Sequence, residues 1–217
     1  MTSNPKLTGG KVVTIADSNK NVGKVTAGYG IKYYVRVRAY SKNGKQVTHG
    51  VWSKVKTVTT PKKKYNLSAE EHTTMINKYT NIIYKLGEKY SMVNAVIFDM
   101  NGDNKSELIV NAGDYEAVRT IYYYSYNPST HSVEKLKGTT SGSHRGFYKD
   151  KKTKKFVTLS NYFCVGQIDK ISLSGKKVKY TQKSYITDTT ARLNRWMKIT
   201  KNFTPLESIN IYDGELY

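Results

Sequence analysis

One change of hydrophobic period, near Pro61, most limits what this chain can fold into. Before it, in the run YYVRVRAY (residues 33–40), aromatic and aliphatic side chains hold the odd positions, and Arg36 and Arg38 fall on the other face. This is the two-residue period of a half-buried strand. After Ser68, apolar residues recur every three or four positions, the period of a helix. The sequence therefore predicts an all-β unit followed by a unit that begins with a helix.

The all-β unit has a second alternating run in residues 53–60, which ends at Pro61. Proline has no N–H to donate to a sheet ladder, so the strand should end there. Residues 41–44, Ser-Lys-Asn-Gly, predict the turn that joins the two strands. Residues 11–15 and 21–25 predict shorter strands upstream.

Three patterns in this unit occur in a fixed order: Tyr33-x-Val35-x-Val37-x-Ala39-Tyr40, then Gly50-x-Trp52-Ser53, then Thr59-Thr60-Pro61. In that order they resemble the last two strands of a bacterial fibronectin type III domain, over residues 1–61. There is room before Tyr33 for the later strands of that fold but not for the first three. The resemblance therefore implies a partial β-sandwich and a chain that is a fragment of a longer protein.

Half a sandwich leaves one apolar sheet face open, because the fold needs two sheets facing each other across a core. We expect that face, in residues 11–60, to be covered by the second domain, by a second copy of the chain or by a swapped strand. A homo-oligomer formed through the incomplete sandwich is one of these expectations.

Residues 62–67 begin with a run of three lysines and predict a linker to a second domain, residues 68–217. Ser68 and Glu71 have the spacing of a capping box, which satisfies the free N–H groups at a helix start. A stripe of apolar residues predicts one long helix, and its Tyr and Met side chains are expected to pack in the core and not to form a ligand box. The stripe consists of Met75, Ile76, Tyr79, Ile82, Ile83, Leu86 and Tyr90.

The remainder of the second domain returns to strand patterns, with a short helix at 191–197. The expected strands span residues 93–98, 108–111, 118–126, 132–136, 156–162, 167–173 and 177–185. In the tyrosine-rich run 122–126, alternation places Tyr122, Tyr124 and Tyr126 on one face and Tyr123 on the other, as core or cross-strand packing. One long helix followed by many short strands predicts an α+β domain on an antiparallel sheet, in a chain that is mainly β.

Oxygen-bearing side chains crowd the stretch FDMNGDNKSELIV, residues 98–110. A tight loop can turn Asp99, Asn101 and Asp103 inward, while Lys105 adds a backbone carbonyl and Glu107 a carboxylate. These hard oxygen donors suit calcium, which takes six to eight of them; magnesium is the weaker candidate because it holds its own water more tightly. Packed negative groups repel one another unless a cation lies between them. The sequence therefore predicts a structural calcium site.

The sequence excludes one alternative to that site, an EF-hand, and leaves one other open. An EF-hand would need a bidentate Glu at the twelfth position, which here is Val110 in an apolar run. An acidic β-turn, with Asp99 and Asn101 bonded to nearby amides, needs no metal. Asp114 and Glu116 follow the next strand and are expected as outer ligands at most.

The pattern Asp99-x-Asn101-Gly102-Asp103-x-x-x-Glu107-Leu108 is similar to the calcium loops of FG-GAP and integrin-propeller repeats. It also resembles uncharacterised secreted domains of Gram-positive bacteria, as does Gly142-Ser143-His144 more loosely. The sixth position, usually a glycine with positive φ, is Asn104, a residue that tolerates that region.

No arrangement for catalysis stands out. Cys164 and His144 can be paired on paper as nucleophile and base, but Phe163-Cys164-Val165 predicts a strand interior, where free cysteine is usually a small buried hydrophobe. Carboxylates outside the acidic loop are scattered, which disfavours a paired-acid glycosidase. The chain is therefore expected not to be an enzyme.

Charge points to the class of partner. The chain has 36 bases and 16 acids, and residues 1–64 hold 14 of the bases but a single acid, Asp17. Such a field attracts polyanions, among them anionic cell-wall polymers, acidic glycans and nucleic acid. Nucleic acid is disfavoured, since Arg36 and Arg38 beside tyrosines are also ordinary on a fibronectin-like outer face. The sequence has no apolar run long enough for a membrane span.

Together these features predict a non-enzymatic binding module, extracellular or on the cell surface, that is stabilised by calcium and acts in adhesion or in binding cell-wall polymers or glycans. The extracellular location is implied by the family resemblance and by the abundance of calcium outside cells. The alternative is an accessory region of a secreted hydrolase whose catalytic domain lies upstream.

Overall fold

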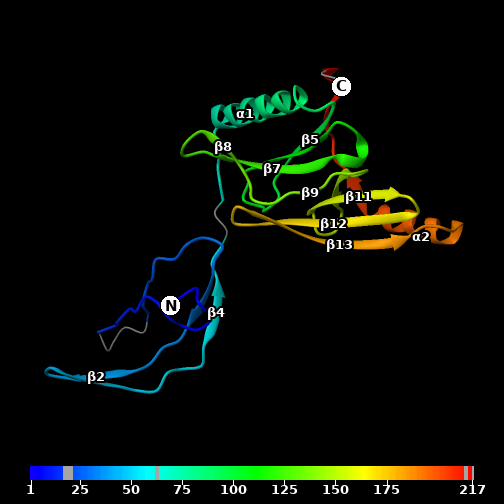
Figure 1. Cartoon of the computed structure of the whole chain (residues 1–217). Helices are drawn as coiled ribbons and strands as arrows, with labels where there is room; N and C mark the ends of the chain where they lie inside the picture. Colours follow the sequence, from blue (N-terminus) through cyan, green and yellow to red (C-terminus); the bar gives the residue numbers. More distant parts are fainter. Residues whose placement is uncertain (17–21, 62–63, 213–214, 217) are drawn as a thin grey trace. The chain divides into compact units, whose positions relative to one another are not determined.

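The computed structural model describes residues 1–16, 22–61, 64–212 and 215–216, and it is mainly β, as predicted (Figure 1). The chain divides into two compact units, Met1–Lys63 and Lys64–Tyr217. The division falls inside the stretch 62–67 that the sequence assigns to a linker.

The first unit consists of two antiparallel strand pairs. β1 (Lys32–Val35) pairs with β4 (Lys56–Thr59), and β2 (Tyr40–Asn43) pairs with β3 (Gln46–His49). The turn between β2 and β3 starts at Gly44, whose φ is 57°, so the prediction of a turn from residue 41 was wrong. The strands expected at 11–15 and 22–25 do not form, and Asn21 lies outside the described residues.

Side chains of the first unit are mostly exposed. Among the described residues before Lys64, only Thr2 is buried, while Val37 is 67% and Val51 93% exposed. Two hydrogen bonds continue the pairing between the two strand pairs. In the backbone, Ser53 N–H donates to the Val37 carbonyl at 2.8 Å, and Val37 N–H donates to the side-chain Oγ of Ser53 at 3.0 Å. The unit is therefore a long hairpin with little core of its own.

The second unit contains a seven-stranded antiparallel sheet. Its strand order is β16-β15-β5-β6-β7-β8, with β9 beside β7. The bounds are β5 (Met92–Phe98), β6 (Glu107–Gly113), β7 (Thr120–Asn127), β8 (Ser132–Lys135), β9 (Thr140–Ser141), β15 (Ile209–Tyr212) and β16 (Glu215–Leu216). The strand predicted from residue 118 begins later, because Glu116–Val118 forms the 3-10 helix η1.

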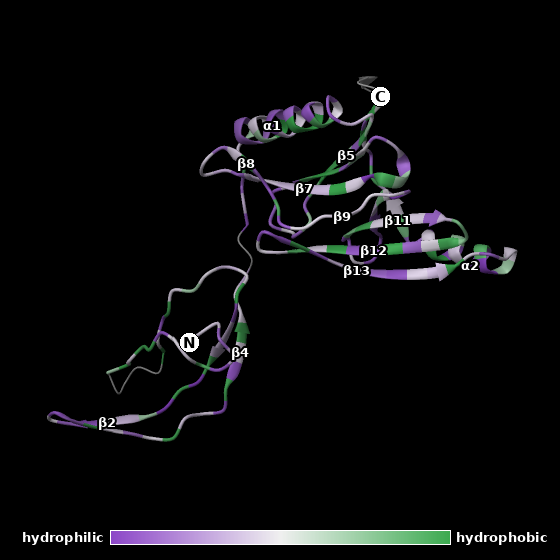
Figure 2. Cartoon of the chain, viewed as in Figure 1, coloured by the Kyte–Doolittle hydropathy of each residue, from purple (hydrophilic) through white to green (hydrophobic). Residues whose placement is uncertain are grey.

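Helix α1 (Ala69–Gly87) covers one face of this sheet, as the apolar stripe predicted (Figure 1). The predicted capping box is present, with Ser68 Oγ accepting from Glu71 N–H and Glu71 Oε2 accepting from Ser68 N–H. Its hydrophobic side, which includes buried Met75, Tyr79 and Ile83, faces the sheet, and its outer side is hydrophilic (Figure 2).

A second, five-stranded sheet lies against the other face of the first, in the order β13-β12-β11-β10-β14. Its strands are β10 (Gly146–Asp150), β11 (Phe156–Tyr162), β12 (Val165–Ser174), β13 (Lys177–Ile186) and β14 (Phe203–Pro205). The core between the sheets includes Ile109 and Tyr123 from one and Phe147 and Ile171 from the other.

The tyrosine alternation predicted for residues 122–126 is confirmed. Tyr123 packs between the sheets, whereas Tyr122, Tyr124 and Tyr126 pack on the α1 side. Tyr123 is fully buried and Tyr126 is 1% exposed. These rings therefore fill two cores and form no exposed aromatic row.

Helix α2 (Thr190–Thr200) closes the outer face of the second sheet. Its Trp196 packs over Gly166 so closely that a Cβ there would lie 2.6 Å from the indole ring. The second unit is thus built of four layers: helix, sheet, sheet, helix. Within the described ranges, no helix combines the length and the apolar character needed to cross a bilayer.

Candidate calcium loop and a polar cleft

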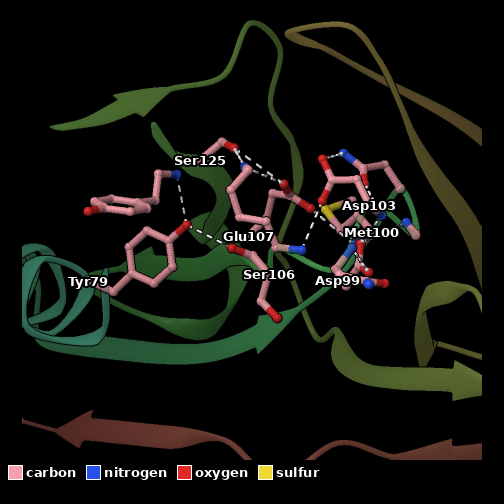
Figure 3. Close-up of polar contacts among 12 residues, drawn as sticks. Tyr79, Asp99, Met100, Asp103, Ser106, Glu107 and Ser125 are labelled. Carbon is pink, nitrogen blue, oxygen red and sulfur yellow. Dashed lines mark hydrogen bonds and ion pairs between the residues drawn. The ribbon is translucent and has the colours of Figure 1, made fainter. Parts of the chain in front are cut away.

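The loop between β5 and β6, residues 99–106, is folded around the carboxylate of Asp99. That carboxylate accepts three backbone N–H groups, from Gly102 at 2.7 Å and Asp103 at 3.1 Å on Oδ1 and from Asn104 at 2.9 Å on Oδ2 (Figure 3). The bend uses positive φ at Gly102 (71°) and at Asn104 (66°), so the sixth position adopts the conformation that a glycine would favour there.

Asn101 and Asp103 are bonded to each other within the loop. Asp103 N–H donates to Asn101 Oδ1 at 2.9 Å, and Asn101 Nδ2 donates to Asp103 Oδ2 at 3.0 Å. Asp103 Oδ1 accepts from Lys105 N–H at 3.0 Å. The three side chains at the first, third and fifth positions are half-buried and lie on one short bend, as their spacing predicted.

Glu107 is fully buried at the start of β6, and a cation is already beside it. Its Oε1 lies 3.3 Å from Lys105 Nζ and accepts from the Ser125 hydroxyl at 3.3 Å, while its Oε2 accepts from Met100 N–H at 3.1 Å (Figure 3). Burial raises the pKa of Glu107 to about 7, although the Lys105 ammonium and the Met100 N–H oppose the shift.

Lys105 contributes its side chain to this cluster, since that side chain is 5% exposed and its ammonium also donates to Ser125 Oγ. From the sequence, only the backbone carbonyl of Lys105 was expected to contribute to the site. Because Lys105 supplies positive charge within the loop, the repulsion among the acids does not by itself require a metal ion.

Helix α1 fixes the end of the loop through Tyr79. The Tyr79 hydroxyl donates to the Ser106 carbonyl at 2.9 Å and accepts from Tyr126 N–H at 2.9 Å, which links the helix to β6 and β7 (Figure 3). Burial raises the pKa of Tyr79 well above its ordinary value, so this phenol keeps its proton over the neutral range.

The loop residues differ in how well they fit a calcium ion. Asp99, Asn101 and Asp103 offer oxygens on one bend, and a carboxylate has about four acceptor sites, of which Asp99 uses three for N–H donors. Glu107 has Lys105 as its counter-charge and fits less well. Across the described ranges, no three His, Cys, Asp or Glu side chains converge as a ready-made metal site.

Asp114 and Glu116 lie too far away to serve as outer ligands. Strand β6 separates them from the loop, and its seven residues span about 20 Å at roughly 3.3 Å each. Glu116 instead pairs with Arg119 at the opposite end of the strand. That expectation was therefore wrong, because an extended strand carries residues close in sequence to opposite ends of the sheet.

The sequence predicted that Cys164 is a buried strand residue, and the structure shows that this prediction was wrong. Phe163 (φ 44°) and Cys164 (φ 58°) form the two-residue turn between β11 and β12, and Cys164 is exposed. Two positive φ angles are typical of a type I′ hairpin turn, in which Asn-Gly is the favoured pair. The chain thus holds two unfavourable residues at this exposed tip.

A polar cleft of about 390 Å³ lies near this hairpin, and no sequence pattern predicted it. We call it the inter-sheet cleft, because its lining comes from the β9–β10 connection and from β11, β12 and β13. Its lining consists of Ser141, Ser143, His144, Arg145, Ser160, Tyr162, Val165, Gln167 and Gln182. Of the patterns named in the sequence, only Gly142-Ser143-His144, which resembles a segment of secreted domains, contributes residues to this lining.

A buried ion pair supports the cleft. Arg145 Nε donates to Asp169 Oδ2 at 2.6 Å, and Arg145 Nη2 donates to Gln167 Oε1 at 2.8 Å. Both charged side chains are more than nine-tenths buried.

Comparison of the chain with known protein families, with curated protein sequences and with solved structures finds no match.

Proposed function

We propose that this chain is a non-enzymatic binding module of an exported or cell-surface bacterial protein, with a calcium ion stabilising the loop between β5 and β6. One observation carries the proposal: Asp99 accepts three successive N–H groups while Asn104 takes a positive φ, so that Asp99, Asn101 and Asp103 share one tight bend. Oxygen donors on such a bend suit calcium.

The calcium would be held by Asp99, Asn101 and Asp103, with Lys105 and Glu107 forming the buried pair behind them. When bound, the ion would add positive charge beside Asp99 and Asp103 and would stabilise the folded state, because it binds that state alone. The role is structural, since Tyr79 connects the end of the loop to α1 and to β7.

The partner we propose is an anionic cell-wall polymer or a glycan. The chain carries a net charge of +20, and the first unit contributes most of it. Arg36 and Arg38 each lie 4.3 Å from the Trp52 ring, so the first hairpin presents guanidinium groups that are held in place by the indole. Fixed cationic groups suit a polymer with repeating negative charge.

Calcium binding is tested by thermal unfolding of the whole chain in calcium, in magnesium and in chelator. We expect calcium to raise the Tm, by linkage, more than magnesium does, and we expect Asp103→Asn to abolish the rise. Asp114→Asn is the matched control, because that carboxylate lies beyond the far end of β6. Equal Tm values in calcium and in chelator would refute the calcium part of the proposal.

Polymer binding is tested by sedimentation with Gram-positive cell walls that carry polyglycerol phosphate, over a series of salt concentrations. We expect binding that weakens as salt rises, because bases on the protein displace counterions from the polymer. Walls stripped of the phosphate polymer are the control. Tighter binding to duplex DNA than to the walls, or no binding to either, would count against this partner.

A further inference from the structure

We propose that the inter-sheet cleft binds a neutral saccharide unit. This inference deepens the proposed glycan-binding role and rests on it. It assigns a specific site in the second unit, independent of the basic first unit and of the calcium loop.

The chemistry of the lining favours a neutral ligand rich in hydroxyl groups. Ser141, Ser143 and Ser160 offer hydroxyls that both donate and accept, and Gln167 and Gln182 offer amides with a donor and an acceptor side by side. Sugars present the same mixture of donors and acceptors on neighbouring carbons. The volume of about 390 Å³ lies within the range of small-ligand sites, roughly 300–1,000 Å³.

The charge in the cleft is already balanced. Arg145 is the charged residue of the lining, and Asp169 lies 2.6 Å from its Nε. An anionic ligand would therefore gain little net attraction. Three of the five guanidinium N–H groups have partners among the described residues, so two remain for a ligand oxygen.

Another polar atom at the site is unsatisfied. His144 lines the cleft, and its Nε2 is buried without a hydrogen-bond partner in the part of the chain that the structure describes. A buried polar atom without a partner is costly, so this wall of the cleft carries an unusual polar group. The His144 ring stacks on Tyr162, which also lines the cleft, with ring centroids 3.6 Å apart.

The walls of the cleft are held rigidly, as a preformed site requires. Asn111, fully buried on β6, donates to the Gly142 carbonyl at 2.9 Å, and Gly142 N–H donates to the Arg119 carbonyl at 2.8 Å. A Cβ at residue 142 would lie 1.7 Å from Asn111 Oδ1, so only glycine fits. The segment that carries Ser143 and His144 is therefore fixed against the first sheet.

The strained hairpin tip adds aromatic surface beside these groups. Phe163 has a positive φ, and its side chain is 81% exposed. Its ring lies edge-on to the ring of Tyr162, with the two ring centroids 4.2 Å apart. Strained residues in exposed positions often mark functional sites. A sugar ring presents a C–H face that packs on aromatic rings, while its hydroxyls reach polar groups, and this edge of the cleft offers both kinds of surface.

The test blocks the cleft from an exposed strand position. Gln182→Trp places an indole in the cleft without disturbing the core, because Gln182 is exposed on β13. Thr181→Trp is the matched control. It introduces the same indole at the neighbouring exposed residue, whose side chain points to the other face of the sheet. The probes are cello-, xylo-, manno- and chito-hexaose, each titrated into the full chain at up to about 10 mM and followed by amide chemical shifts and calorimetry.

We expect at least one hexaose to bind and to shift the side-chain amide signals of Gln167 and Gln182. Gln182→Trp should weaken that binding by about tenfold or more, and Thr181→Trp should leave it within about twofold. Binding should persist in high salt, because the ligand is neutral.

Two outcomes would overturn the inference. One is the absence of binding by all four hexaoses, and the other is binding that Gln182→Trp and Thr181→Trp affect equally. In both cases the proposed function is judged separately, by sedimentation with phosphate-bearing walls. If the chain binds those walls while the hexaoses fail, the cleft assignment falls and the wall-binding module stands.

Discussion

At the scale of residues, Lys105 and Glu107 form a buried ion pair in the second unit. They are two positions apart, and both are nearly excluded from water. Removal of one partner from a buried ion pair typically costs about 3–5 kcal/mol, because the other charge is left without compensation. Glu107 has an alternative, since its raised pKa lets it take up a proton and become neutral.

We therefore predict that Lys105→Met lowers the free energy of unfolding by about 2 kcal/mol in chelator, less than a fixed charge would cost. Urea denaturation measures this difference. The double variant Lys105→Met with Glu107→Gln should be more stable than Lys105→Met alone, because no buried charge is left unpaired. A single variant as stable as the wild type would show that the pair contributes nothing.

At the scale of elements, the β11–β12 hairpin has a turn that its sequence does not favour. Phe163 and Cys164 both have positive φ, which costs a residue with a Cβ about 1–2 kcal/mol. The neighbouring hairpin between β12 and β13 uses Gly175 at φ 60°, where glycine has no such cost.

We predict that Cys164→Gly raises the free energy of unfolding by about 1 kcal/mol, because it removes backbone strain at an exposed site. Gly175→Ala is the converse control and should lower it by a similar amount, since a Cβ there meets open space and only the backbone is strained. Chemical denaturation of both variants checks the pair. Loss of stability in Cys164→Gly would mean that the thiol makes a stabilising contact that outweighs the strain.

At the scale of the whole molecule, the two units differ in how much they bury. The second unit has three buried clusters between its four layers, whereas the first has a single buried residue among those described. Backbone hydrogen bonds that lie near water open with low free energy, and those in a packed core open only with global unfolding.

We predict that amides of β1 and β4 exchange with solvent at least about 100-fold faster than amides of β6, which is buried along its whole length. Hydrogen exchange at low protein concentration measures this difference. If a second copy covers the open sheet face, protection of β1 and β4 should rise with concentration, in step with the mass seen by light scattering. Strong protection in a dilute monomer would contradict the prediction.

The sequence by itself determined the features that depend on near neighbours. The capping box at Ser68 and the apolar stripe fixed α1, and alternation fixed which tyrosines of β7 face each core. The spacing of Asp99, Asn101 and Asp103 predicted their common bend, and the positive φ at Asn104 was anticipated as well. These outcomes depend on backbone geometry within a few residues, which local side chains control.

Only the tertiary structure decided what depends on residues distant in sequence. It placed β15 beside β5, buried the Lys105 ammonium against Glu107, and turned the chain at Phe163 and Cys164, where propensity indicates a strand. The inter-sheet cleft brings Ser141 and Gln182 together from separate strands. Strand order, register and burial are set by packing across sheets, and no local pattern carries that information.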